Sequence, residues 1–204
     1  MSVILAALFG YLLGSVPFGL IITRFAGVGD IRNIGSGNIG ATNVLRTGRK
    51  GLALATLLLD GGKGAVAVLI VSAFDGSDEW LPLVAGIAAV LGHNFPVWLR
   101  FKGGKGVATT LGVMLAAAPA VGLMTAVAWA IVAAVSRISS LAALVSLALA
   151  PLFAVMTSER DAALAFLILA MLGWIRHRAN LKRLAKGEEP RIGVKSAEKP
   201  AEGK

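Results

Sequence analysis

Residues 3–25 read VILAALFGYLLGSVPFGLIITRF, and this run decides the class of fold. Its one charged residue is Arg24. A helix that crosses a bilayer needs about 20 mostly apolar residues, so the run predicts a membrane span. Gly14, Pro17 and Gly19 predict a kink or a close helix contact within it. No Lys or Arg precedes the run, so it lacks the basic front of a cleaved signal peptide and is expected to be retained.

The composition extends this interpretation to the whole chain. Hydrophobic residues make up 56% of the 204 residues and charged residues 15%, and the mean hydropathy is +0.78. Soluble domains carry about 25% charged residues, so we expect an all-α polytopic membrane protein. The chain has no cysteine, which excludes disulfide and thiolate chemistry. No cluster of metal-ligating residues stands out, and no cofactor is predicted.

The net charge of +9 does not predict nucleic-acid binding, because of where the charge lies. Nine of the 20 Lys and Arg residues fall in 176–204, directly after the last apolar run. Basic residues beside a membrane mark the cytoplasmic side and attract anionic lipid. We therefore expect the lipid bilayer as a partner, no nucleic acid, and a cytoplasmic C-terminus.

About seven transmembrane helices account for the apolar runs. The expected spans are residues 3–25, 52–74, 81–99, 107–118, 120–135, 141–156 and 162–175. The run 107–135 is split at Pro119 because basic residues flank it on both sides, which requires an even number of crossings. Residues 107–118 reach only about 18 Å at 1.5 Å per residue, so this short helix is expected to start inside the membrane. Residues 1–190 then form a single domain, and 191–204 form a polar, disordered tail.

This topology places the N-terminus and the loops 75–79 and 157–161 outside. It gathers the polar or Gly-rich segments on the cytoplasmic face. Those segments are residues 33–50, 102–106, 139–140 and 176–180. Their convergence is stronger evidence for a functional site than any one motif.

Residues 33–43 read NIGSGNIGATN and form the segment that is most typical of an anion cradle. Gly35, Gly37 and Gly40 allow bends that other residues avoid, and successive N–H groups in such a bend can hold an anion. Short polar side chains and the fork of Arg46 could add hydrogen bonds to a phosphate. An ordinary Gly-rich loop between membrane helices is an equally good interpretation of this segment alone.

Two nucleotide-binding motifs are excluded. The three glycines fit Gly-x-Gly-x-x-Gly, but a dinucleotide site needs a soluble strand before them, and here a membrane span precedes them. A Walker A motif is absent because Lys105 is followed by Gly106. Lys105 instead opens a short helix, whose free N–H groups and positive dipole end favour an anion. A basic turn that only flanks the membrane is the alternative.

Other polar residues lie in or beside the spans. Asp60 and Lys63 are three apart on one helix face, and we expect a structural ion pair, with a direct substrate role as the alternative. His93 is expected to make a structural hydrogen bond. His177 and Asn180 share a helix face and are site candidates, against a basic membrane anchor. No Asp stands five residues after either His, so that acyltransferase signature is absent.

Three segments carry a resemblance to a known family. They are SGNIGATN (36–43), GHNFP followed by FKGGKGVAT (92–109), and HRANLKRLAKGEE (177–189). They resemble the three motif regions of the bacterial acyl-phosphate-dependent glycerol-3-phosphate acyltransferases, the PlsY family. The resemblance implies a seven-helix enzyme of the bacterial inner membrane with its active site facing the cytoplasm. It implies that acyl phosphate and glycerol 3-phosphate are the substrates and lysophosphatidic acid the product, in phospholipid biosynthesis.

The resemblance also implies residue roles. The phosphate of the acyl donor would be held by Gly37, Asn38, Ile39, Gly40, Ala41, Thr42 and Asn43. Glycerol 3-phosphate would be contacted by Ser36, Arg46, Lys105, Ser140, His177 and Asn180, of which Ser36, Arg46, Lys105 and His177 are also the catalytic candidates. Ser139 could take the place of Ser140. Glu189 would be a structural anchor, and the acceptor's own phosphate, rather than a protein base, would take the hydroxyl proton.

A transporter or channel for small phosphorylated anions is the alternative function. The polar segments lie on one side of the membrane, which counts against a path through it. The enzyme that supplies acyl phosphate is a further candidate partner. The residues indicate neither the acyl chain length nor the oligomeric state.

Overall fold

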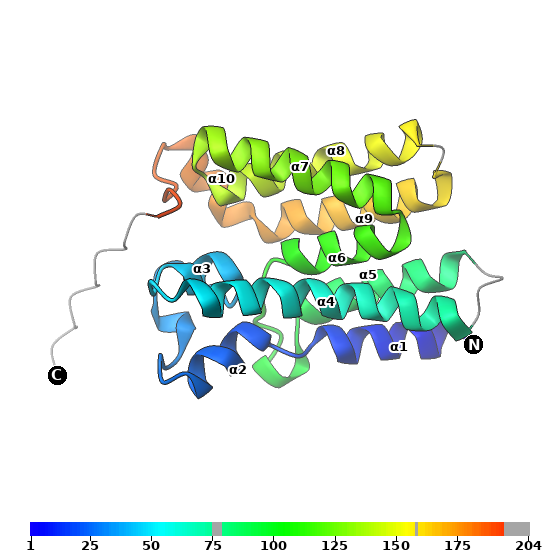
Figure 1. Cartoon of the computed structure of the whole chain (residues 1–204), viewed down its shortest axis with the longest axis horizontal. Coiled ribbons are helices and arrows are strands. Elements are labelled where there is room, and N and C mark those ends of the chain that lie inside the picture. The colour runs from blue at the N-terminus through cyan, green and yellow to red at the C-terminus, as the bar shows by residue number, and fades with distance from the viewer. Residues whose placement is uncertain (75–78, 158, 194–204) are drawn as a thin grey trace, which may run out of the picture.

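The computed structural model describes residues 1–74, 79–157 and 159–193, and these residues fold as a bundle of helices (Figure 1). The helices are α1 (Val3–Gly14), α2 (Phe18–Phe25), η1 (Ile31–Asn33), α3 (Ala41–Leu45), α4 (Lys50–Phe74), α5 (Trp80–Asn94), η2 (Val97–Leu99), α6 (Val107–Ala117), α7 (Pro119–Ser136), α8 (Ser139–Met156), α9 (Arg160–Arg176) and α10 (Arg178–Ala185).

The apolar helices confirm the predicted fold class. By length and composition, five segments of the described chain could each cross a membrane: Val3–Phe25, Lys50–Phe74, Trp80–Leu99, Pro119–Ser136 and Ser139–Met156. A sixth is α9 with α10, which are bent by 62° at the break between them. The predicted total of seven is reached only by counting the short helix α6, so the number of crossings and the sidedness of the termini stay predictions.

The predicted kink in the first span is a break between α1 and α2 at Pro17. Proline has no N–H to donate and clashes with the preceding turn, so it sits at the start of a helix more easily than within one. Pro17 is the N-cap of α2 here. At the break, the carbonyl oxygen of Val16 accepts hydrogen bonds from the Phe18 N–H at 3.1 Å and from Lys63 of α4 at 2.8 Å.

Small residues bring the helix backbones into contact. A Cβ built on Gly10 or Gly14 of α1 would lie 2.1 or 2.0 Å from the carbonyl oxygens of Ala85 and Ala89 in α5. Close approach through glycine and alanine is typical of helix packing in membranes, where the hydrophobic effect does not drive helices together.

Helix α6 packs in the same way against the middle of α4. A Cβ on Gly112 would lie 1.9 Å from the Gly61 carbonyl oxygen, and one on Gly64 would lie 2.3 Å from that of Thr109. Figure 1 shows α6 starting partway along α4 and running to one end of the bundle. Helix α6 is thus short, as predicted, and its start inside the membrane stays a prediction.

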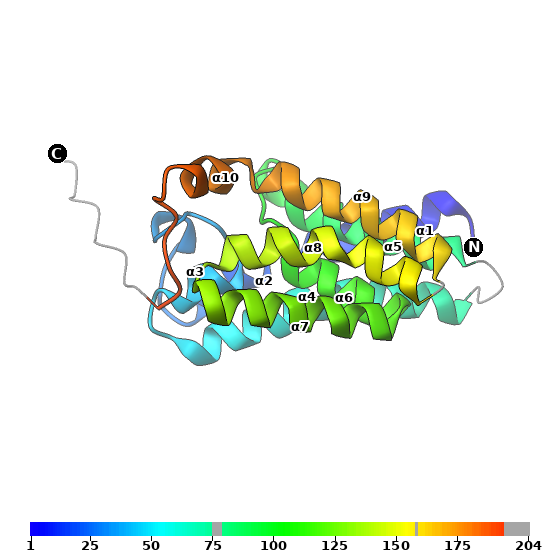
Figure 2. The same cartoon turned by 90° about the horizontal axis from the view of Figure 1, so that it is seen from above.

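The polar segments gather at one end of the bundle. The α2–α3 region, the α7–α8 turn and α10 lie at the left in Figures 1 and 2, and the start of α1 and the α8–α9 turn lie at the right. This arrangement puts the predicted cytoplasmic segments together. Residues 75–78, 158 and 194–204 fall outside the described residues. They include most of the predicted outer loop 75–79, one residue of the predicted outer loop 157–161, and most of the predicted disordered tail.

Candidate active site

Asn43 holds the Gly-rich loop in shape. Its side-chain amide donates to the carbonyl oxygens of Ile31, Ile34 and Asn38 at 3.0, 2.9 and 2.8 Å. Its Oδ1 accepts a hydrogen bond from the Ser36 N–H at 3.0 Å. A buried amide with all its polar atoms paired fixes the backbone around it. The side chain of Asn43 therefore shapes the cradle, rather than being free for a ligand.

The glycines of the loop differ in what they contribute. Gly35 and Gly37 have φ angles of +54° and +69°, in the left-handed region that favours glycine. Gly40 has a φ of −85°, which other residues adopt readily, so the expectation that all three glycines make unusual bends is wrong for Gly40. It is the N-cap of α3, whose first N–H groups have no partner within the helix.

Two residues of the loop motif lie away from the cavity described below. Ile39 is buried in an apolar cluster with Leu20, Ile31 and Val44, and neither it nor Gly37 lines the cavity. The side chain of Ile39 and the backbone of Gly37 therefore help to shape the loop without lining the cavity. A motif marks the loop in the sequence, but it does not say which of its residues face inward.

The turn before α6 is clamped from two sides. The Gly103 and Gly104 N–H groups donate to the carbonyls of Asn94 and His93 at 3.2 and 3.0 Å. Arg176 donates to the Gly103 and Gly104 carbonyls at 2.9 to 3.1 Å, and its guanidinium lies 4.9 Å from the centre of the Phe95 ring. The two glycines leave space for the chain at 93–96, and the clamp fixes the position of Lys105, the next residue.

Lys105 lies in a cluster of charges. The pKa of its ammonium group is lowered to about 8, mainly by burial. Glu189 opposes this shift, and the charges of Arg183, Arg46 and Arg176 contribute to it. Lys105 is therefore still mostly protonated at neutral pH. An anion that entered would reduce the repulsion among these cations, and it would raise the pKa of Lys105 again.

His177 lies in the break between α9 and α10. Its Nδ1 is 2.7 Å from the Gly173 carbonyl oxygen, which can only accept, so Nδ1 carries the proton and Nε2 is the nitrogen left to accept from a ligand. Burial lowers the pKa of His177 to about 4, with Lys105 and Arg176 adding to the effect and the Gly173 contact opposing it. The imidazole is neutral at pH 7.

Glu189 joins α8, α10 and the chain that follows α10. Its carboxylate accepts hydrogen bonds from Ser140 at 2.7 Å, Asn180 at 2.5 Å and Arg183 at 2.7 Å. Burial alone would raise the pKa of Glu189, but these donors outweigh it and the pKa is lowered. The Asn180 Oδ1 is buried and has no hydrogen-bond partner among the described residues, so it can accept one from a ligand.

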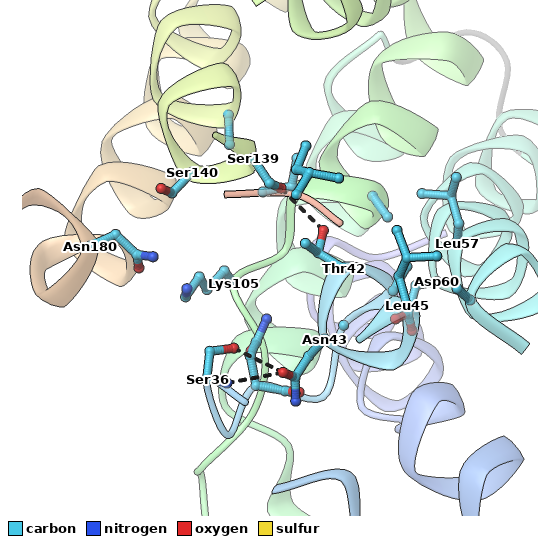
Figure 3. Close-up of a pocket in the computed structure, with 18 of the residues that line it drawn as sticks. Ser36, Thr42, Asn43, Leu45, Leu57, Asp60, Lys105, Ser139, Ser140 and Asn180 are labelled. Atoms are coloured by element: carbon cyan, nitrogen blue, oxygen red, sulfur yellow. Dashed lines mark hydrogen bonds between the residues drawn. The ribbon is translucent and has the colours of Figure 1, made fainter. Parts of the chain in front are cut away.

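The two serines at the start of α8 have different partners. Ser139 lies 3.1 Å from the hydroxyl of Thr42 and so ties the Gly-rich loop to α8. Ser140 bonds Glu189. Both serines line the cavity, and Figure 3 shows Ser140 on the side of Asn180 and Ser139 on the side of Thr42.

One cavity of about 780 Å³ brings the candidates together. Every predicted site residue except Gly37 and Ile39 lines it. Lys105, Asn180 and Ser36 border the same open space (Figure 3). Its other wall is apolar and comes from α4, α6, α7 and α8. That wall includes Leu54, Leu57, Leu111, Ala126, Trp129 and Ala143.

The expected Asp60–Lys63 ion pair is present, with 2.8 Å between Nζ and Oδ1. His93 Nδ1 lies 3.6 Å from the same carboxylate oxygen. Asp60 and His93 also reach the cavity wall. Of the three, His93 lies directly behind the turn that carries Lys105, because a Cβ built on Gly104 would be 2.0 Å from its Nε2.

The sequence reasoning missed Arg176, Arg183 and Trp129. Arg183 follows Asn180 by three residues, so helical spacing could have placed both on one face. In the sequence, Arg176 is one of several basic residues at the membrane edge, and no pattern indicates that it contacts the turn before α6. Trp129 lies in a uniformly apolar span, where no signal distinguishes the side facing the cavity.

Comparison with known proteins gives a consistent result. A family model described as glycerol-3-phosphate acyltransferase matches residues 4–187. The glycerol-3-phosphate acyltransferase of Rhodospirillum rubrum is 62% identical over 200 residues, covering 95% of this chain and 93% of that protein. The protein of the same name from Paramagnetospirillum magneticum is 65% identical over 195 residues and covers 96% of each.

Solved structures agree with the sequence relatives. The crystal structure of PlsY (YgiH), an integral membrane glycerol 3-phosphate acyltransferase, matches in its glycerol 3-phosphate form with a TM-score of 0.88 and 40% identity. Its lysophosphatidic acid form matches with a TM-score of 0.87 and 38% identity. Each covers 95% of this chain and 96% of the other. This chain therefore belongs to the glycerol-3-phosphate acyltransferase family of integral membrane proteins.

Proposed function

We propose that the chain transfers the acyl group of an acyl phosphate to the sn-1 hydroxyl of glycerol 3-phosphate. The products are 1-acyl-glycerol 3-phosphate and phosphate. The observation that carries the proposal is that one cavity combines a cationic mouth with an apolar wall. An acyl phosphate has the same two parts. Its phosphate would lie against the Gly-rich loop, and its alkyl tail would lie among Leu57, Leu111 and Trp129.

The charges support two anionic substrates. Arg46, Lys105 and Arg183 line the cavity, and Glu189 offsets one of them. Two phosphorylated substrates bring about three or more negative charges, which the remaining cations and the N–H groups of the loop would stabilise. The PlsY structures named for their glycerol 3-phosphate form and lysophosphatidic acid form support this choice, because both compounds carry a phosphate group.

The proposed reaction needs positioning more than acid–base chemistry. The acceptor hydroxyl oxygen attacks the acyl carbon, the bond from that carbon to the phosphate oxygen breaks, and phosphate leaves with its electron pair. The hydroxyl proton goes to the acceptor's own phosphate. His177 orients the acceptor by accepting a hydrogen bond at Nε2 from the neighbouring sn-2 hydroxyl. It does not take the reacting proton, because a pKa of about 4 makes the imidazole a weak base. An acyl phosphate is already activated, so orientation and charge stabilisation can supply most of the rate.

The test uses the purified, full-length protein with palmitoyl phosphate and glycerol 3-phosphate. We expect lysophosphatidic acid and phosphate in equal amounts. Palmitoyl-CoA and palmitoyl-acyl carrier protein, each offered alone, should give no product, and glycerol should not replace glycerol 3-phosphate. Product from palmitoyl-CoA at a comparable rate would contradict the choice of donor.

We also propose that the site faces the cytoplasm of the bacterial inner membrane. The basic residues at the polar end support this orientation. The chain has no native cysteine, so Glu79→Cys and Lys186→Cys, both at exposed positions, can be labelled separately. In intact cells without their outer membrane, an impermeant maleimide should label the first variant and spare the second. The opposite result would reverse the topology.

A transporter is less well supported. A second cavity of about 530 Å³ lies near Glu79 and Arg160, at the other end of the bundle. An apolar core that includes Val113, Met114 and Leu147 packs the bundle interior. A reaction at one face of the membrane therefore fits the described residues better than transport of an anion through the bundle.

A further inference from the structure

Residues 189–193, which we call the strap, lie at the mouth of the cavity. Helix α10 ends at Ala185. The turn after it passes through Gly187, whose φ is +70°, and the Glu188 N–H returns to the Arg183 carbonyl at 2.8 Å. A left-handed glycine after the last turn is a common helix ending. It turns the chain back toward α7 and α8, as Figure 2 shows at the left.

The strap is attached at both ends. Glu189 bonds Ser140, Asn180 and Arg183 at one end, as described above. At the other, the Ile192 N–H donates to the Arg137 carbonyl at 2.6 Å, and Arg137 Nη2 donates to the Ile192 carbonyl at 3.4 Å. Arg137 lies in the turn between α7 and α8, so the strap connects that turn to α10. Ile192, predicted to belong to a disordered tail, thus contacts the domain through its backbone.

The strap contributes apolar groups to a charged opening. Pro190 and Ile192 both line the cavity, beside Arg46, Lys50 and Lys105. A branched alkyl side chain binds no phosphate, but it displaces water. The match to the family model ends at residue 187, and of the strap only Glu189 belongs to the segment 177–189 that resembles a family motif.

We propose that the strap selects the acceptor, with Ile192 as a specificity-determining residue that keeps water from the acyl carbon. This inference rests on the proposed function. Transfer and hydrolysis break the same bond between the acyl carbon and the phosphate oxygen. In transfer the new bond is made by the glycerol 3-phosphate hydroxyl. In hydrolysis it is made by water, which gives one proton to the departing phosphate, so that the products are a fatty acid and inorganic phosphate. Excluding water from a closed site is an established means of preventing such a side reaction.

The experiment measures fatty acid and lysophosphatidic acid formed from palmitoyl phosphate at saturating glycerol 3-phosphate. It compares the wild-type chain, a chain that ends at Arg191, and a matched control that ends at Gly193. Both truncations keep Glu189. We expect the ratio of hydrolysis to transfer to rise on the order of tenfold when the chain ends at Arg191, and to stay unchanged when it ends at Gly193.

A point-mutant pair tests the side chain itself. Ile192→Ser should raise the ratio, and Ile192→Leu, which keeps the apolar bulk, should not. The inference is overturned if the chain ending at Arg191 keeps the wild-type ratio, or if the control rises equally. It is also overturned if Ile192→Ser and Ile192→Leu behave alike, or if truncation removes both activities together, because the strap would then hold the site rather than select the acceptor. A wild-type protein that forms no lysophosphatidic acid would instead refute the proposed function.

Discussion

Replacing Gly104 with alanine should displace the turn that carries Lys105. A Cβ built on Gly104 would lie 2.0 Å from His93 Nε2, and ordinary contact begins at 3.4 Å, so the two groups must separate by about 1.4 Å. His93 is 4% exposed and lies against Asp60, so the ring has little room to move. Arg176 would also lose its short contacts with the Gly104 carbonyl.

A misplacement of about 1 Å can cost on the order of 10²-fold in rate. We therefore expect Gly104→Ala to lower kcat/KM for glycerol 3-phosphate by on the order of 10²-fold while the protein stays folded. Initial rates of lysophosphatidic acid formation and the Tm of the purified variant measure the two effects. Gly62→Ala is the matched control, because no heavy atom lies within 4 Å of its added Cβ. It should keep wild-type activity.

A double-mutant cycle separates this steric cause from others. His93→Ala removes the ring that the new methyl group would meet. If the clash with the ring is the cause, Gly104→Ala should lower kcat/KM much less in the His93→Ala background than in the wild type. The reasoning is refuted if the kcat/KM of Gly104→Ala stays within about threefold of wild type. It is also refuted if the activation free-energy changes of Gly104→Ala and His93→Ala simply add in the double variant.

Three more predictions follow from the site. Above pH about 8, where Lys105 loses its proton, a pH–rate profile should show kcat/KM falling because the anionic acceptor meets less positive charge. Lys105→Arg should shift that fall to higher pH. His177→Gln should keep clearly more activity than His177→Ala, and its rate should still follow an ionisation near pH 6, the second pKa of the acceptor phosphate. Loss of that ionisation with the imidazole would make His177 the base. Gly35→Ala should reduce activity far more than Gly40→Ala in the same assay, because its Cβ would lie 2.6 Å from Asn43 Oδ1 at a φ of +54°.

The spans were predictable because the bilayer imposes a length and a polarity on each helix. Residues 141–156 and 162–175 were placed within a few residues of α8 and α9 from apolar length alone. The short helix α6 was predicted from the basic residues that flank the run 107–135. The break at Pro17 was visible in the sequence, since proline interrupts a helix for local steric reasons.

The contacts within the site were less predictable, because they join residues far apart in the chain. Arg176 meets the Gly104 carbonyl across 72 residues, and Ile192 meets Arg137 across 55. Hydropathy and charge counts do not encode such pairs. The loop motif indicated where an anion site could lie, but whether Ile39 faces the cavity depends on the apolar cluster behind it.

The hydrogen bonds of Asn43 have a consequence for inhibition. A loop held by its own amide before any ligand arrives needs little ordering when one binds. Fixing a flexible backbone costs roughly 1–2 kcal/mol per residue, and a preformed loop avoids most of that loss. Compact, rigid phosphate mimics should therefore bind without a large free-energy cost for ordering the loop. Replacing Asn43 with a residue that cannot make these hydrogen bonds should reduce the affinity of such compounds, even though the Asn43 side chain bonds the protein backbone and not the ligand.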